Sequence, residues 1–356
     1  MKEVKTVDPK VVMADQTLGY ILARRKMNPA ELRCIKQEIT DMAPVIFDIT
    51  LDSLNDKPAA LFHRLEDMRP AVSPEEDQVE KAHRSGFTLL QLKGADAATG
   101  ISPAITAALA AARSFGLRTS LAVDPFLAEA VDGLAALRAA AEKYGIYSVI
   151  VTDPFARMAP LALNNAIVRL KAELPCLLEF HGNNANGLAT GNALSALSGG
   201  CCCVSAAIGG VGGYPPFEEI IMGMKHLLGL TVDVPQGIAN RCQRVMDLTG
   251  HSIEVTKPVI GSQIFAHESG IHVDGVTKNS RLYEPFSPEM VGLSRNIVIG
   301  RHSGLASIRY KLNQLNISLR PEDARHVLTK VQKLSVKQKA PVSDAQFRLL
   351  VQEAAL

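Results

Sequence analysis

Residues 118–151 read RTSLAVDPFLAEAVDGLAALRAAAEKYGIYSVIV, and this stretch decides the fold. Two apolar runs, at 118–123 and 147–151, have the length and composition of buried strands. Between them, residues 127–143 have the alanine- and leucine-rich pattern of a helix, which Gly145 follows. Strands of a parallel sheet are covered on both faces by helices, so they appear in sequence as continuous apolar runs. The stretch therefore predicts one strand–helix–strand unit of a parallel sheet.

The same alternation extends over the first two thirds of the chain. Strands are expected at 11–14, 45–49, 69–72, 87–92, 118–123, 147–151, 176–180 and 201–206. Helices are expected at 29–39, 59–65, 74–84, 102–114, 127–143, 160–173, 189–197 and 217–228. Eight strand–helix pairs in about 220 residues favour a closed (β/α)₈ TIM barrel of the α/β class over an open sheet.

The alternation ends after Leu230. A helix is expected at 235–248, an irregular segment rich in His and Gly at 257–304, and helices at 303–315, 321–335 and 343–355. Long irregular segments in compact proteins are usually functional. We therefore predict a TIM barrel at 1–230 and a mostly helical C-terminal domain at 231–356.

The composition is that of a globular protein. Hydrophobic residues make up 47% of the 356 residues and the net charge is +2, so we expect a large core and neither nucleic acid nor a membrane as partner. Cys201, Cys202 and Cys203 are adjacent, which suits neither a disulfide framework nor a zinc motif. No apolar run reaches the roughly 18 residues of a membrane span, and residues 1–10 have no signal-peptide pattern. A reduced, cytoplasmic location is expected.

Three motifs in the C-terminal domain carry a family resemblance. Residues 265–275 read FAHESGIHVDG, residues 281–286 read RLYEPF and residues 299–304 read IGRHSG. Several fixed residues in a fixed order are far more specific than one short motif. The chain, from residue 14 to about 350, resembles the homocitrate synthase and 2-isopropylmalate synthase family, which condenses acetyl-CoA with a 2-oxo acid on a divalent metal (Mg, Mn or Zn). Nitrogen-fixation-type homocitrate synthase is the most similar form.

The resemblance implies roles for residues of both domains. The C-terminal domain is expected to be a lid and dimerisation region that reaches over the barrel of its dimer mate. His272 matches the lid acid/base of the condensation, and Tyr283 matches the tyrosine beside it, so both are candidate catalytic residues. Candidate substrate-binding residues are His267 and Ser269 in the lid and Asp153 at the end of the sixth strand.

The barrel departs from the family at its first strand. Family members carry D-T-T-L-R-D-G-E there; the Arg polarises the oxo acid and the following Asp binds the metal. Residues 15–22 read DQTLGYIL, so Gly19 stands at the Arg position and Tyr20 at the metal-ligand position. We expect Tyr20 to fill the space of the missing metal. After the eighth strand, residues 209–216 read GGVGGYPP and lack the Asn that completes the family's site.

Strands six and seven depart as well. The family's E-F-H-x-H-N-D-x-G is replaced by EFHGNNANG at 179–187, where His181 is the remaining metal histidine. Asn183 replaces the second histidine and offers only a weak amide oxygen, and Ala185 replaces the aspartate. Pro154 stands where the family has a substrate-holding threonine. These positions indicate a degenerate metal site, so divalent metal and acetyl-CoA are expectations of the family rather than of this barrel.

Several functions stay open on the sequence alone. The chain is a partner subunit or pseudoenzyme, as a homodimer or as a heterodimer with a catalytic paralogue, or an active synthase that uses Asp48, Asp124 or Asp153 as substitute metal ligands. A protein that binds a small acid or an acyl-CoA at the barrel mouth is a third possibility. A fourth is a Schiff-base enzyme that uses Lys93, at the end of the fourth strand.

Overall fold

A computed structural model of the chain describes residues 11–54, 62, 64–95, 100–128, 131–268, 275, 279 and 282–355. The chain forms two compact units. Unit 1 comprises Met1–Pro235 with Arg241–Ser252, and unit 2 comprises Gln236–Asn240 with Ile253–Leu356. Each unit is described by itself.

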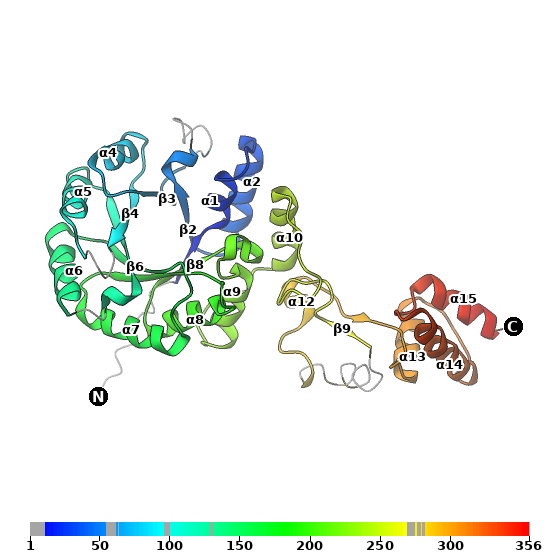
Figure 1. The fold of residues 1–356 in the computed structure, drawn as a ribbon. Coiled ribbons are helices and arrows are strands. Elements are labelled where there is room, and N and C mark those ends of the chain that lie inside the picture. The colour runs from blue at the N-terminus through cyan, green and yellow to red at the C-terminus, as the bar shows by residue number, and fades with distance from the viewer. Residues whose placement is uncertain are drawn as a thin grey trace. The chain divides into compact units, whose positions relative to one another are not determined.

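Unit 1 is a closed barrel of eight parallel strands in sequence order (Figure 1), which confirms the predicted fold class. Pairing of β1 with β8 closes the barrel, with Val12 opposite Cys203 and Asp15 opposite Ala206. The strands are β1 Val12–Asp15, β2 Val45–Thr50, β3 Met68–Val72, β4 Leu89–Ala95, β5 Arg118–Val123, β6 Ser148–Asp153, β7 Leu177–Gly182 and β8 Cys203–Ala206.

Helices surround the strands (Figure 1), and most lie within two residues of their predicted positions. They are α2 Pro29–Thr40, α4 Glu76–Arg84, α5 Pro103–Ser114, α6 Val131–Tyr144, α7 Pro160–Glu173, α8 Ala189–Gly199, α9 Phe217–His226 and α10 Ile238–Thr249. The helix predicted at 59–65 falls mostly outside the described residues. Good caps explain the accurate starts: Asn28 and Glu31 form a capping box at α2, and Ser102 caps α5.

One short helix was not predicted. Helix α1, Thr17–Leu22, follows β1 directly, in the segment that the family comparison treated as a ligand-bearing strand end. Leu18 and Ile21, on one face of the helix, are buried, and the carboxylate of Asp15 accepts a hydrogen bond from the Leu18 N–H at 2.9 Å. This apolar face and this hydrogen bond stabilise the short helix, because isolated helices of this length are not stable in water.

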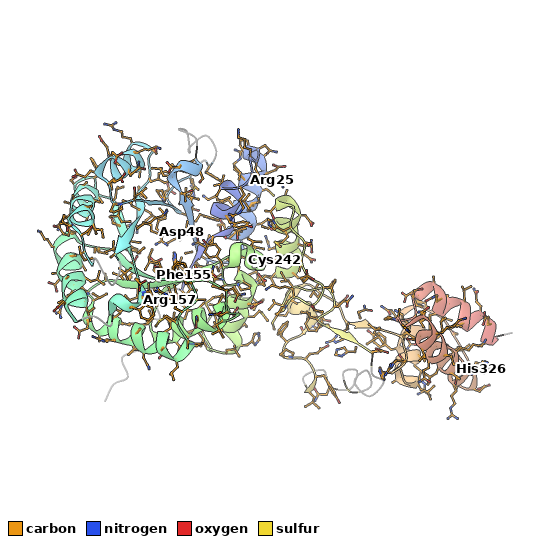
Figure 2. The ribbon with its side chains drawn as sticks, viewed as in Figure 1. Arg25, Asp48, Phe155, Arg157, Cys242 and His326 are labelled. Carbon is orange, nitrogen blue, oxygen red and sulfur yellow. The ribbon has the colours of Figure 1, made fainter. Side chains whose placement is uncertain are left out.

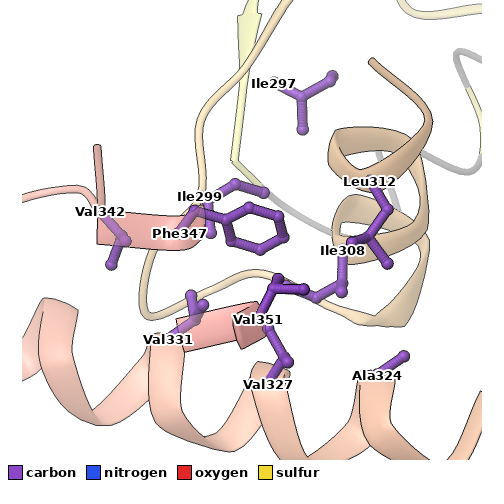
Figure 3. Close-up of a cluster of buried hydrophobic side chains, with 10 residues drawn as sticks. All are labelled: Ile297, Ile299, Ile308, Leu312, Ala324, Val327, Val331, Val342, Phe347 and Val351. Carbon is purple, nitrogen blue, oxygen red and sulfur yellow. The ribbon is translucent and has the colours of Figure 1, made fainter. Parts of the chain in front are cut away.

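Unit 2 holds a short parallel pair of strands and a small helical core. The strands β9, Ala266–His267, and β10, Asn296–Ile297, are paired, and α12, Pro288–Val291, precedes β10. Helices α13 Leu305–Gln314, α14 Pro321–Gln338 and α15 Asp344–Ala355 pack around the ring of Phe347 (Figure 3). None of the helices formed by the described residues is long and apolar enough to cross a membrane.

Candidate functional site

A buried arginine dominates the interior of the barrel. Arg69 lies on β3 with only 1% of its surface exposed. Its guanidinium donates from Nε and Nη2 to the two carboxylate oxygens of Asp48 at 2.7 and 3.1 Å. Nη1 donates to Glu179 Oε1 at 2.8 Å and to the Ser120 hydroxyl at 2.9 Å. Figure 2 labels Asp48 within the ring of strands. One cation thus ties β2, β3, β5 and β7 together.

The charges of this network are coupled. Burial disfavours the charge of Arg69, but Asp48 and Glu179 outweigh it and keep the pKa of Arg69 above its usual value. Burial also opposes ionisation of Glu179, yet the positive charge of Arg69 holds the pKa of Glu179 well below its usual range. Ser148 adds a hydrogen bond to the same oxygen, Glu179 Oε1. Buried charges are tolerated when they are paired and hydrogen-bonded in this way.

His181, the predicted metal remnant, faces the same two carboxylates. Its Nε2 lies 3.7 Å from Asp48 Oδ2 and 3.6 Å from Glu179 Oε2, beyond hydrogen-bond distance of both. Gln16, at the start of the loop after β1, donates to Asp48 Oδ2 at 2.8 Å. Among the described residues, His181 Nε2 and Glu179 Oε2 are buried atoms without a hydrogen-bond partner. The structure therefore brings His181 to the barrel interior next to ionised acceptors.

Helix α1 packs so tightly on β2 that no side chain fits at Gly19. A Cβ atom built there would overlap the carbonyl oxygen of Asp48, and it would also lie 3.4 Å from Ile49 Cα. The obstacle is backbone, which cannot rotate away as a flexible side chain would. The position that corresponds to the family's arginine is thus closed by the main chain of β2.

Tyr20 is held by the loop after β8. This loop, Ile208–Gly213, has positive φ at Gly209, Gly210, Gly212 and Gly213, a conformation that glycine adopts readily. A Cβ at Gly212 would meet the Tyr20 ring at 2.7 Å, so the ring lies directly on this glycine. The Tyr20 ring has two further neighbours. The Arg24 guanidinium lies 3.9 Å from the centroid of the Tyr20 ring, and the centroid of the His251 ring lies 6.0 Å from it. Tyr20 is therefore a packing residue between α1 and the β8 loop.

The remaining strand-end candidates are occupied by the chain's own donors. Asn183 Oδ1 accepts the Ala185 N–H at 2.9 Å, and the Asn183 amide nitrogen borders Gly213. Asp153, fully buried at the end of β6, accepts the N–H groups of Arg157 and Met158 at 2.9 and 2.8 Å. These contacts shape the turns that follow β6 and β7.

Arg157 binds the carboxylate of Asp124, which follows β5. Its Nη2 donates to Asp124 Oδ2 at 2.6 Å, and its guanidinium lies 4.6 Å from the Phe126 ring centroid and 5.7 Å from that of Phe155. Phe155 is 72% exposed and follows the exposed Pro154; Figure 2 labels Phe155 and Arg157 close together. Lys93 on β4 is also exposed. It therefore lacks the desolvated surroundings that a Schiff-base lysine requires.

Comparisons with known proteins agree with this architecture. Residues 51–247, more than half of the chain, match the family described as HMGL-like, and residues 259–339 match the family described as homocitrate synthase post-HMGL domain-like. The chain belongs to the homocitrate synthase and 2-isopropylmalate synthase family. This confirms the resemblance carried by the lid motifs.

The chain spans about half the length of the curated relatives that it matches. Homocitrate synthase 1 of Nostoc sp. is 35% identical over 199 residues, which are 54% of this chain and 52% of the relative. The 2-isopropylmalate synthase 2 of Caldanaerobacter subterraneus is 32% identical over 198 residues, again 54% and 52%. In fold, the hydroxymethylglutaryl-CoA lyase of Pseudomonas aeruginosa superposes with a TM-score of 0.54 at 17% identity, covering 68% of this chain and 94% of the lyase.

The barrel residues of this family member do not fit a divalent metal. Its Asp48 is bound by Arg69 and Gln16, and the amide oxygen of Asn183 is bound by a backbone N–H. A hard divalent ion needs about six oxygen or imidazole ligand positions. Over the part of the chain that the structure describes, no group of three or more His, Cys, Asp or Glu is placed to hold a metal. We therefore derive no chemical step through a metal in this barrel.

The lid residues of the family are described only in part. His272 and Ser269 lie outside the described residues. His267 Nε2 lies 3.5 Å from Glu284 Oε1, and Glu284 accepts a bidentate pair of hydrogen bonds from Arg295 at 2.9 and 2.8 Å. The ring of Tyr283, 39% exposed, lies over Gly275. In unit 2, Glu284 is thus hydrogen-bonded to Arg295 and faces the ring of His267.

A cavity of about 960 Å³ lies at the amino-terminal ends of the barrel strands. Its lining includes the start of β1 and β2, at Met13 and Val45, and the end of α8, at Gly200. Barrel enzymes place their chemistry at the carboxyl ends of the strands. The cavity therefore carries no catalytic assignment.

Asp15 is a further buried acid, which the sequence analysis does not single out. Burial raises its pKa to about 6, although hydrogen bonds from Leu18 and Thr17 oppose this shift. Its Oδ1 is buried without a hydrogen-bond partner among the described atoms. Because the folded pKa lies above the unfolded value of 3.8, the folded state binds the proton more tightly. Stability therefore falls as the pH rises from about 4 to 6, and the cost is complete above about pH 7.

Asp15→Asn is expected to stabilise the protein by up to about 3 kcal/mol at pH 8 and by well under about 1 kcal/mol at pH 4. Asparagine keeps the acceptor for the Leu18 N–H and removes the buried charge. Urea denaturation of both proteins at the two pH values measures the difference. Equal stability of variant and parent at pH 8 would show that Asp15 carries no ionisation cost.

Proposed function

We propose that this chain does not catalyse the condensation of acetyl-CoA with a 2-oxo acid by itself, and that it serves as the non-catalytic partner subunit of a metal-competent paralogue. The observation that carries the first part is the overlap between a Cβ at Gly19 and the backbone of Asp48, which leaves no room for the family's arginine. Removal of a group that stabilises developing charge costs about 10²–10³ in rate.

The strand-end carboxylates support the same proposal. Substitute metal ligands would have to come from Asp48, Asp124 or Asp153. Each of these already accepts hydrogen bonds from arginine, glutamine or backbone donors. Recruiting Asp48 or Asp153 to a metal would leave a buried donor unpaired, which costs about 1–3 kcal/mol per group. Recruiting Asp124 would release only the exposed guanidinium of Arg157.

The lid supports the partner role. Its motif at 265–275, including His272, is nearly complete, whereas His181 is the one family metal histidine that the barrel keeps. If the lid of one subunit closes the barrel of the other, this chain supplies a competent lid to a paralogue whose barrel binds metal. The paralogue would in turn supply the metal and the arginine.

The test measures CoA release from acetyl-CoA and 2-oxoglutarate with Mn²⁺, for this chain alone, for a catalytic paralogue from the same genome, and for the two co-expressed. We expect no turnover from the chain alone and a stable complex with turnover from the pair. Turnover by the chain alone, or a chain that forms only homodimers beside the paralogue, would contradict the proposal.

Two single variants of this chain serve as a matched pair within the complex. His272→Ala in the lid is expected to lower turnover of the pair by about 10²–10⁴, the range for an acid/base group. His181→Ala in the barrel is expected to leave it unchanged, because that barrel does no chemistry. The reverse pattern would locate the chemistry in this chain's own barrel.

A further inference from the structure

The cavity at the amino-terminal ends of the strands is built by unit 1, to which all of its described lining residues belong. Its walls come from the starts of β1 and β2, the end of α2, helices α7 to α9, and residues 230–233 after α9. Pockets that bind small molecules have volumes of about 300–1,000 Å³, and this cavity has about 960 Å³. It is therefore large enough for a small molecule, and it lies at the end of the barrel opposite to the strand ends that barrel enzymes use for chemistry.

The inner wall of this cavity is apolar. Six lining residues are more than nine-tenths buried: Met13, Met42, Leu197, Cys201, Ile221 and Met224. Burial raises the pKa of the Cys201 thiol well above its usual value, so this sulfur is uncharged. Methionine side chains are unbranched and flexible, and they adapt to ligands of different shapes. The six residues therefore offer a ligand apolar contact and no charge.

Two carboxylates of the wall are paired with cations of the chain itself. Asp67 Oδ1 accepts a hydrogen bond from Lys36 Nζ at 2.6 Å. Asp41 Oδ2 accepts one from Arg241 Nη1 at 3.3 Å. Because each of these carboxylates already faces a positive charge, a cationic ligand beside it would bring two cations together.

Two exposed charges of opposite sign complete the polar part of the wall. Lys171 Nζ donates to the carbonyl oxygen of Gly200 at 3.3 Å, and Asp233 follows α9. With the two ion pairs, three carboxylates thus stand against three cations around the cavity. Removing an ion from water is costly unless an unpaired opposite charge receives it. The lining therefore favours an uncharged ligand.

We propose that this cavity binds an uncharged apolar molecule, such as a straight-chain or isoprenoid alcohol, with its hydrocarbon part against the six buried residues of the inner wall. Removal of that hydrocarbon surface from water drives the binding. The hydroxyl group stays at the polar edge, where Thr40 and Thr231 also line the cavity. The site goes beyond the proposed function, because it uses none of the residues that carry that function.

The test measures binding to the full chain, by calorimetry and thermal denaturation, of three probes that share one eight-carbon chain: 1-octanol, octanoate and octylammonium. We expect 1-octanol at about 10-fold above its Kd to raise the Tm by roughly 3–5 °C. Octanoate and octylammonium are expected to bind at least about tenfold more weakly. Absence of 1-octanol binding, or equally tight binding of either ion, would overturn the proposal.

Tryptophan substitutions locate the bound probe. Ala43→Trp and Val232→Trp each fill part of the cavity from a half-buried lining residue outside the helices and strands. Each should weaken 1-octanol binding by about tenfold or more. Ala136→Trp adds the same side chain to the exposed face of α6, outside the cavity lining, and should leave binding unchanged. Unchanged 1-octanol binding by either folded cavity variant would overturn the proposal.

The competing occupant is the chain's own N-terminal segment, because residues 1–10 precede Val11, which lines the cavity. A variant that lacks residues 2–10 distinguishes the two. Equal 1-octanol binding by the parent and the shortened variant is the expected result. Binding by the shortened variant alone would assign the cavity to the segment and overturn the proposal. None of these outcomes depends on turnover, which tests the proposed function.

Discussion

Arg69→Met is expected to lower the free energy of unfolding by about 3–5 kcal/mol in metal-free buffer, because it leaves two ionised carboxylates buried without their cation. Methionine fills much of the same volume, so the loss reports charge rather than a cavity. Urea denaturation followed by circular dichroism measures it. A change below about 1 kcal/mol would mean that Asp48 and Glu179 accept protons or water without difficulty.

Two controls define the origin of that loss. Arg138→Met removes an exposed arginine whose partners, Glu142 and Glu173, are also exposed, so it should cost no more than about 1 kcal/mol. The triple variant D48N/R69M/E179Q removes all three charges and should recover most of the stability. Replacement of a whole buried charged set by neutral groups is often tolerated, whereas removal of one member is not.

Gly19→Ala is expected to destabilise the barrel by about 1–3 kcal/mol or more, the range for inserted atoms that force the backbone to shift. The added methyl group would overlap the Asp48 carbonyl oxygen, so α1 must move away from β2. Differential scanning calorimetry of the variant would show a lower Tm. An unchanged Tm would mean that α1 moves without cost.

Gly191→Ala is the matched control for that variant. Gly191 also lies in a helix, α8, but a Cβ there would meet only Pro160 Cγ at 3.7 Å, an ordinary contact. The change should be neutral or stabilising by up to about 1 kcal/mol, since alanine favours helix. The opposite signs expected for the two variants separate the close contact at Gly19 from the intrinsic cost of glycine.

The barrel was predictable because its signals are local and repeated. The apolar run of β5 and the helix α7, which begins at Pro160, have the bounds that the sequence predicts. Each strand is buried on both faces, so eight similar runs identify the class even where one is weak. Helix α1 is not predicted because its six residues are too few for a periodic pattern and the family motif places residues 15–22 at the end of the first strand.

The site was only partly predictable. Asn183 follows β7 directly, whereas Gly19 and Tyr20 lie within α1 and not at the end of β1. No pattern within 15–22 reveals that α1 leaves no room for a side chain at Gly19. Arg69 was treated as part of a weak strand. The available signal was the charge of Arg69 within a strand that is expected to be buried. A buried arginine requires opposite charges nearby, and in a barrel these come from other strands. Asp48 and Glu179, each within a buried strand, supply these charges. The sequence does not show that they pair with Arg69, because β7 comes close to β3 only when the barrel closes.

The seat of α1 against β2 also couples two features that are separate in the sequence. Any side chain larger than hydrogen at position 19 requires α1 to move away from the Asp48 carbonyl. Such a movement would also shift Tyr20, whose ring lies on Gly212 of the loop after β8. The main-chain contact at Gly19 therefore links the position of the first helix to the shape of the last loop of the barrel.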